Sequence, residues 1–421
     1  MPFYQRRGDV PRKRHIVFRE NGRLLTEEVM GLEGFTGNES ILYHLQSPCR
    51  VKELGAFTPI ERDEWVPESH AHRRMNTYDV DPSGDEINGR RTLMWNSDVE
   101  ISLCRPEASM DYFFRNGEGD EVVFVHEGTG TLETTFGDVP YKDGDYLVVP
   151  RGTTYRFVPA KRPPEAGAVS ELGVGGSAAD APSYSPQRYL VFETPGLIEI
   201  PRRYRNQYGQ ILEGAPYYHR DIHPPAELKT HREDGEFLVK VRVRGGYQDY
   251  VLDYHPFDVV GWDGYLYPWT FSIHDFEPIT GRIHQPPPSH QTFQGPNFVI
   301  CSFCPRHLDF DPEAVPIPYH HSNLQSEEMI YYVSGNFGSR KGISVGSITL
   351  HPSGLPHGPA PGLAEKALGV RETTELAVMC DTFRPLKLST LARDLDDGHY
   401  ALSWYEPPSE EPDLAGVTSH L

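Results

Sequence analysis

Four residues at fixed intervals constrain the fold of this chain most strongly: Gly346, Pro352, Gly354 and His357 in the segment GSITLHPSGLPH. Glycine permits tight turns, and proline fixes the backbone just before the final histidine. The segment therefore predicts a strand, a turn and a returning strand that ends on His357. Such a pattern favours an all-β fold in which this histidine lines the mouth of a barrel.

A matching motif, HSNLQSEE, lies upstream and contains His321, Asn323 and Glu328. Because side chains two residues apart in a strand share a face, His321 and Asn323 should point into the same barrel mouth. With His357 from the returning strand, His321 and Glu328 would form a face of two imidazoles and one carboxylate. Such a set leaves about three positions of an octahedral metal open, as expected for a non-haem Fe(II) oxygenase. The sequence thus predicts an iron site.

The carboxylate of this site has two candidates, because Glu327 and Glu328 are adjacent and point to opposite faces of a strand. We favour Glu328, since it precedes Gly335 by the same interval that separates Glu121 from Gly128 in the other half of the chain. The choice between the two glutamates fixes which face of the predicted strand looks toward the histidines.

The first half of the chain repeats the pattern without its ligands. Segment 121–128 leads to segment 144–155, which reads G-x5-P-x-G-x2-Y with Tyr155 in place of the final histidine. No histidine lies in segment 114–119, just before Glu121. His126 and Glu127 could belong to a second metal site, but a metal-free copy kept for structure is the favoured interpretation. Both halves resemble the cupin metal-site motif, and the duplication predicts a bicupin built from jelly-roll and β-sandwich domains with minor α content.

Composition limits the function classes. The chain has 421 residues, enough for two β-domains, and its 38 prolines and 39 glycines suit short strands and tight turns. The formal charge of −20 argues against a nucleic-acid partner. No stretch approaches the roughly 18 apolar residues of a membrane span, and the N-terminus lacks an apolar signal core, so we expect no membrane association and a cytoplasmic location. A helix is considered near residues 24–31.

Several motifs resemble the homogentisate 1,2-dioxygenase family over most of the chain. They are PYHHSN at 318–323, GSITLH at 346–351, LPHGP at 355–359 and HQPPPS at 284–289. The resemblance implies an N-terminal β-sandwich domain over 1–275, whose metal-free cupin has its core at about 110–260, and a C-terminal cupin over 276–421 that holds Fe(II). It also implies a homo-oligomer, a trimer or hexamer.

The same resemblance implies roles for individual residues. It makes His321, Glu328 and His357 the iron ligands and His284 the acid/base group, although His290 is close enough to compete. His351 matches a histidine that contacts substrate or supports the ligands. Asn323 and Phe337 are further candidates for contact with substrate.

Two departures from the family pattern mark a diverged subgroup. Phe337 stands where the family has a tyrosine that contacts substrate, so a substrate hydrogen bond must be supplied by another group. One extra residue also separates His321 from the ligand carboxylate. Both points leave the aromatic substrate open.

The expected activity is extradiol-type ring cleavage by Fe(II) and O2. With homogentisate the product would be maleylacetoacetate, a step in tyrosine and phenylalanine catabolism. Two alternatives are a dioxygenase of a related hydroquinone or gentisate-like aromatic, and a non-catalytic bicupin that only binds a ligand. The intact G-x5-P-x-G-x2-H pattern argues against the binding protein, because such a descendant would be free to lose its ligands.

Overall fold

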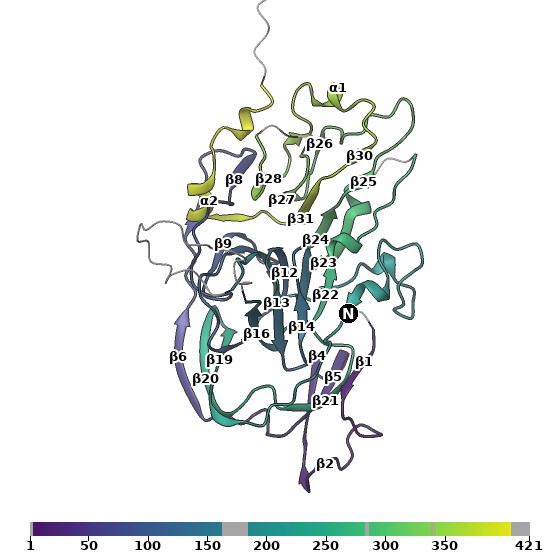
Figure 1. Cartoon of the computed structure of the whole chain (residues 1–421). Coiled ribbons are helices and arrows are strands. Elements are labelled where there is room, and N and C mark those ends of the chain that lie inside the picture. The colour runs from purple at the N-terminus through teal and green to yellow at the C-terminus, as the bar shows by residue number, and fades with distance from the viewer. Residues whose placement is uncertain (1–2, 162–183, 283–285, 338–339, 341, 406–421) are drawn as a thin grey trace, which may run out of the picture.

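The computed structural model describes residues 3–161, 184–282, 286–337, 340 and 342–405 (Figure 1). Strands dominate these ranges, and the two α-helices, α1 (Leu363–Ala367) and α2 (Thr390–Leu395), are short. The prediction of an all-β chain with minor α content is confirmed. Within the described ranges, no helix combines the length and apolar character needed to cross a membrane.

Three large sheets form the body of the molecule. The nine-stranded sheet has the order β18 (Ile222–His223), β22 (Trp269–Ser272), β15 (Asp145–Val149), β12 (Asp120–Glu127), β17 (Arg188–Thr194), β10 (Glu100–Cys104), β9 (Arg90–Trp95), β32 (Lys387–Ser389), β7 (Glu64–Trp65). The seven-stranded sheet has the order β14 (Val139–Tyr141), β13 (Gly130–Thr134), β16 (Thr154–Pro159), β11 (Phe113–Asn116), β19 (Asp234–Val243), β20 (Gly246–Tyr254), β6 (Glu53–Pro59). The six-stranded sheet has the order β23 (Gln291–Gly295), β24 (Phe298–Phe303), β31 (Leu376–Thr382), β27 (Glu327–Ser334), β28 (Ser347–His351), β8 (Arg73–Asn76).

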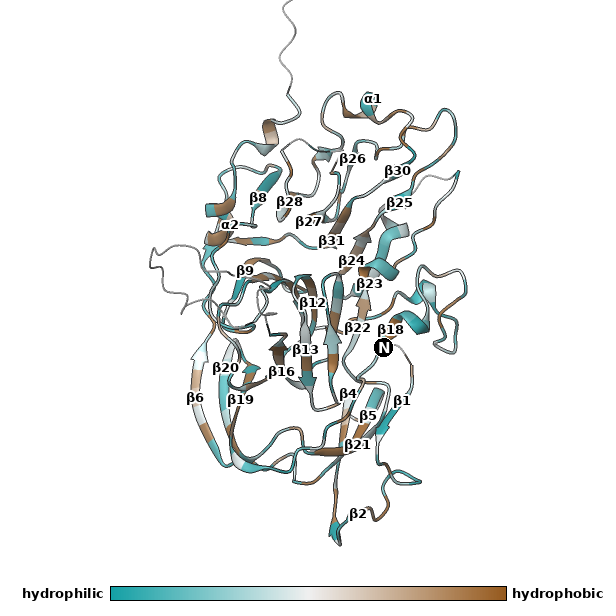
Figure 2. Ribbon diagram, viewed as in Figure 1, coloured by the Kyte–Doolittle hydropathy of each residue, from teal (hydrophilic) through white to brown (hydrophobic). Residues whose placement is uncertain are grey.

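The nine-stranded sheet is buried on both faces, as its central strand β12 shows. Val122 and Phe124 point to one face and join a core that includes residues of the six-stranded sheet. Val123 and Val125 point to the other face and pack with residues of the seven-stranded sheet. Because strand side chains alternate between faces, a run of apolar residues such as this one fits a sheet covered on both sides. Apolar residues accordingly colour the middle of β12 and most of β31 brown in Figure 2.

Two strands cross between the halves of the chain. β8, from residues 73–76, pairs with β28 at the edge of the six-stranded sheet, and β32, from residues 387–389, pairs with β9 in the nine-stranded sheet. The division of the chain at residue 275 remains a prediction, and these pairings tie segments from either side of it into shared sheets. They also bring residues near position 72 close to the C-terminal half.

A fourth sheet, at the bottom of Figure 1, corrects one expectation. It consists of β1 (Gln5–Gly8), β21 (Val259–Gly264), β5 (Thr36–His44) and β4 (Thr26–Glu33). The helix considered near residues 24–31 is wrong, because this segment forms β4 and pairs with β5 along its length. Pairing with a long neighbouring strand outweighed the local helical tendency of the segment.

The internal duplication appears in the strand register. In the first half Glu121 of β12 lies opposite Val149 of β15, five residues after Gly144. In the second half Glu328 of β27 lies opposite His351 of β28, five residues after Gly346. The equal register confirms that the two segments are equivalent units of a bicupin.

The paired glycines of the two motifs adopt the same unusual backbone. Gly144 and Gly152 have φ angles of 85° and 84°, and Gly346 and Gly354 have φ angles of 74° and 81°. Positive φ is strained for residues with a Cβ atom, so glycine is required at these turns. The G-x5-P-x-G motif therefore marks a pair of tight turns in each half of the chain.

Candidate metal centre

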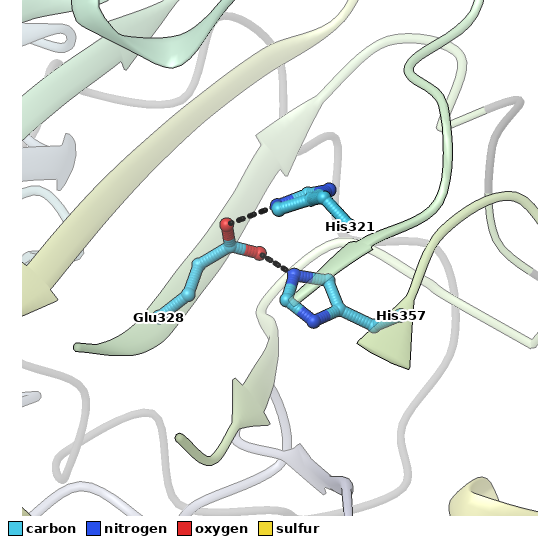
Figure 3. Close-up of side chains that lie close together, drawn as sticks. All are labelled: His321, Glu328 and His357. Carbon is cyan, nitrogen blue, oxygen red and sulfur yellow. Dashed lines mark ion pairs between the residues drawn. The ribbon is translucent and has the colours of Figure 1, made fainter. Parts of the chain in front are cut away.

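The three predicted ligands come together at the open side of the six-stranded sheet. Two short strands, β26 (His321–Ser322) and β29 (Pro356–His357), pair so that His321 lies opposite His357. Glu328 is the second residue of β27 and faces both imidazoles (Figure 3). One donor atom from each of the three residues lies within 4.8 Å of the others, which makes them a group that could hold a metal ion.

The two imidazoles present the same nitrogen to the carboxylate. His321 Nε2 lies 3.7 Å from Glu328 Oε2, and His357 Nε2 lies 3.4 Å from Glu328 Oε1. Their Nδ1 atoms lie 3.3 Å and 3.4 Å from backbone carbonyl oxygens. If each Nδ1–H donates to its carbonyl, both Nε2 lone pairs face carboxylate oxygens, and a cation between them removes the repulsion. His357 Nε2 is buried and makes no hydrogen bond, which also fits a metal ligand.

The charge on Glu328 is strongly stabilised. Burial alone would raise the pKa of Glu328, but the neighbouring imidazoles of His321, His351 and His357 outweigh it and hold that pKa well below its usual value. The nearby Glu328 carboxylate raises the pKa of His321, against the opposing effect of burial. A carboxylate that stays ionised near two imidazoles is the donor chemistry that a divalent metal requires.

Glu327 faces away from the two histidines. Its Oε2 accepts a hydrogen bond from the Leu386 backbone amide at 2.7 Å, on the opposite face of β27. The structure therefore places Glu328, the favoured candidate, beside His321 and His357.

His351 lies behind the carboxylate. It is fully buried, with Nδ1 2.7 Å from Glu328 Oε1 and Nε2 3.3 Å from the Tyr400 hydroxyl. Burial, only partly offset by Glu328, lowers the pKa of His351 to about 3, so the ring is neutral. Its Nδ1–H then donates to Glu328, and Tyr400 O–H donates to Nε2. Because both ring nitrogens of His351 have partners within the protein, the residue is better suited to orienting the Glu328 carboxylate than to contacting substrate.

The remaining predicted residues lie around this centre. Asn323 accepts a hydrogen bond at its backbone oxygen from Gly354 N (2.7 Å), and Phe337 packs on Tyr332 with ring centroids 5.0 Å apart. His290 is fully buried where η4 (Pro287–His290) meets β23, which is separated from β27 by two strands, β24 and β31. His284 lies outside the described residues.

Two further aromatic residues of the centre, His72 and Trp404, were not predicted from the sequence. His72, just before β8, packs edge-on against His351 and His357, with centroids 5.5 Å and 5.8 Å away. Trp404, after η5 (Tyr400–Leu402), lies 5.2 Å from the His72 ring. No spacing in the sequence connects these positions to the motif, because strand exchange at β8 and the C-terminal turn bring them to it.

Asp381 is a further acidic group near the centre. It lies opposite Glu328 in the pairing of β27 with β31. Burial, and then the charge of Glu328, raise the pKa of Asp381 well above its usual value. Asp381 is therefore a neutral neighbour of the ionised Glu328.

In the first half an arginine side chain, Arg90, lies beside Glu121, the glutamate equivalent to Glu328. Glu121 is fully buried and accepts short hydrogen bonds from Arg90 Nη1 and Tyr155 OH, and a third at 3.2 Å from Asn116. Arg90 Nη2 also donates to Tyr155 OH at 3.0 Å. The guanidinium thus supplies beside Glu121 the positive charge that a metal ion would supply beside Glu328.

Comparisons with known proteins find dioxygenases among the sequence relatives of this chain. No family model matches the chain. A protein of Saccharolobus solfataricus named "Putative dioxygenase" is 42% identical, over 96% of this chain and 100% of its own length. A homogentisate 1,2-dioxygenase of Bradyrhizobium diazoefficiens is 24% identical, over 85% of this chain and 76% of its own. Among solved structures, a cupin 2 conserved barrel domain protein from Leptotrichia buccalis matches 75% of this chain and 99% of its own, with 9% identity and a TM-score of 0.30.

The two sequence relatives indicate which family the chain belongs to. The Saccharolobus protein is similar enough, along nearly the whole chain, to place both proteins in one group of dioxygenases. The more distant Bradyrhizobium protein relates that group to the homogentisate 1,2-dioxygenases. The chain belongs to the homogentisate 1,2-dioxygenase family, as a member of a diverged subgroup of dioxygenases.

Proposed function

We propose that this dioxygenase binds Fe(II) and opens the ring of a hydroquinone-type aromatic acid, with homogentisate converted to maleylacetoacetate as the first reaction to test. One observation carries the proposal: His321, Glu328 and His357 converge with two Nε2 atoms and one carboxylate. Two imidazoles and a carboxylate on one face, with the other positions open, are the usual donors of non-haem Fe(II) oxygenases. The names of the distant relatives support homogentisate as substrate.

The residues of the candidate metal centre would have different roles. Bound Fe(II) would supply a Lewis acid and a redox partner for dioxygen. His321, Glu328 and His357 would hold the ion, and His351 with Tyr400 would keep the Glu328 carboxylate in one orientation. The rings of His72 and Trp404 would limit the entry of water.

The substrate proton requires an acceptor in the protein. His290 and His284 remain the proposed acid/base candidates, and an imidazole suits this role near neutral pH. His290 would need its ring to reach the substrate from the edge strand β23.

A related hydroquinone, such as a gentisate-like acid, is the second candidate substrate. Phe337 favours this alternative, since its ring packs on Tyr332 and offers no hydroxyl where the family pattern has a tyrosine. A smaller or differently substituted ring would not need that hydrogen bond.

The test is oxygen uptake by protein loaded with Fe(II) under nitrogen. Homogentisate, gentisate and unsubstituted hydroquinone would be compared, while the ring-opened product is followed in the ultraviolet. We expect turnover with homogentisate or gentisate, and none with the matched variant His357→Ala. Tight binding of these aromatics with no oxygen uptake from any of them would instead identify a binding protein.

A further inference from the structure

The geometry points to Arg340 as the residue that binds the carboxylate of an aromatic acid at this centre. The inference rests on the proposed function and deepens it, because it names the chemical class of substrate and the group that recognises it.

Arg340 lies directly beside the candidate ligands. Its Nη1 donates a short hydrogen bond to the backbone oxygen of Gly358, the residue after His357. Trp404 Nε1 donates to the same oxygen at 3.1 Å, so the guanidinium and the indole meet at one point. Glu328, Tyr332 and Tyr400 all lie within electrostatic reach of the guanidinium.

The guanidinium has more donors than partners. Arg340 Nε is buried without a hydrogen bond, and the neutral Tyr332 hydroxyl is a side-chain partner of the guanidinium. Within the described ranges no carboxylate forms an ion pair with Arg340. Glu375 is within electrostatic reach, but burial raises the pKa of that carboxyl. A guanidinium removed from water is costly unless an anion pairs with it. Arg340 is therefore built to receive a negative charge from outside the chain.

The composition of the ligand group favours the same anion. The group that could hold a metal contains one carboxylate, Glu328, beside the imidazoles of His321 and His357. A bound divalent ion and Arg340 together then leave an excess of positive charge. A substrate that brings both a carboxylate and an acidic phenol would neutralise this excess.

Shape and chemistry agree on an aromatic acid. The planar guanidinium matches a carboxylate with two parallel hydrogen bonds. The nearby rings of His72 and Trp404 offer aromatic faces to a substrate ring. Arg340 can also supply the polar contact that Phe337, three residues earlier, cannot make.

The experiment compares an acid with its uncharged amide. Under nitrogen, calorimetry would measure binding of 2-hydroxyphenylacetate and of its carboxamide to the Fe(II)-loaded protein. We expect the acid to bind about 10–100-fold more tightly than the amide. Arg340→Gln should remove this preference by weakening the binding of the acid, while the affinity for the amide stays unchanged. Arg340→Lys should keep part of the preference. Arg371→Gln is the matched control, because Arg371 also donates to a backbone oxygen, Phe310 O at 2.9 Å.

Each outcome decides something. Equal affinity of the unaltered protein for acid and amide would overturn the inference. This comparison needs no variant, so it tests the inference even if Arg340→Gln fails to fold. A preference that persists in Arg340→Gln would overturn it as well. If the acid preference depends on Arg340 but no hydroquinone is consumed, the proposed reaction fails while the anion site stands. In turnover, loss of the guanidinium should raise KM for the acid far more than it lowers kcat.

Discussion

Glu121 and Glu328 occupy equivalent positions in the two halves of the molecule, and both are buried. Around Glu121 the chain supplies its own cation, since Arg90 donates to the carboxylate and Tyr155 stands at the third ligand position. Around Glu328 two imidazoles leave their Nε2 atoms facing the carboxylate. A buried carboxylate needs a positive neighbour. In the first half a side chain meets this need, whereas in the second half His321, Glu328 and His357 form a group that could hold an ion.

The strand next to each glutamate repeats the contrast. Glu193 of β17 lies opposite Glu121, and Asp381 of β31 lies opposite Glu328. Arg242 Nη1 pairs with Glu193 at 2.5 Å, but within the described residues no arginine pairs with Asp381. Glu121 and Glu193 each have an arginine partner, whereas within the described residues neither Glu328 nor Asp381 forms an ion pair with an arginine. This difference leaves His321, Glu328 and His357 as the group that could hold a metal ion.

The largest expected effect removes the metal. His321→Ala, Glu328→Ala and His357→Ala should each reduce bound iron from about one per chain to near zero, because three donors are the minimum for this type of site. Ring-cleaving activity should fall to background. Metal analysis of protein purified without oxygen provides the measurement.

Glu327→Gln is the control for these variants, since Gln can still accept the hydrogen bond from Leu386. Iron content and activity should be unchanged. Two irons per chain in the unaltered protein would contradict the contrast between the halves, because the first half would then also bind metal.

Arg90→Ala should destabilise the protein by about 3–5 kcal/mol, because it leaves the Glu121 carboxylate buried without its cation. Iron content of the folded fraction should not change. Urea denaturation gives the free energy of unfolding. Arg62→Ala, which breaks a more exposed ion pair with Glu100, should cost about 0–1 kcal/mol. Equal costs for the two variants would show that Arg90 is not the internal cation of the first half.

Smaller effects are expected from the residues that orient Glu328. His351→Asn should weaken iron binding or activity about 10–100-fold, and Tyr400→Phe should lie at the low end of that range. Iron affinity measured by competition with a chelator would show the change. An unaltered affinity in both variants would mean that the position of Glu328 does not depend on this hydrogen-bond chain.

The smallest effect concerns pH and the first half. Burial raises the pKa of Glu193 to about 7, against the lowering effect of Arg242. Between pH 4.5 and pH 7 the folded state therefore holds a proton that the unfolded state has released, so stability due to Glu193 decreases as pH rises through this window. The change should be on the order of 1–2 kcal/mol. Denaturation at a series of pH values should show a flatter dependence for Glu193→Gln, and parallel curves would disprove the assignment.

The sequence predicted the parts of this protein that depend on local spacing. The turns at Gly346 and Gly354, the strand between them and the position of His357 all follow from the backbone demands of one hairpin. The repeat at segments 121–128 and 144–155 predicted the second barrel for the same reason. Even the choice of Glu328 followed from an interval to a turn glycine, Gly335, whose φ is 92°.

Other features depended on contacts between distant segments, and only the tertiary structure decided them. Arg90 reaches Glu121 from another strand, and His72 reaches His357 because β8 joins the C-terminal sheet. Arg340 is notable because no carboxylate in the described part of the chain pairs with its guanidinium, which the sequence does not reveal. Spacing determines how a hairpin turns and which face its side chains share, whereas the pairing of buried charges is decided by how whole sheets pack.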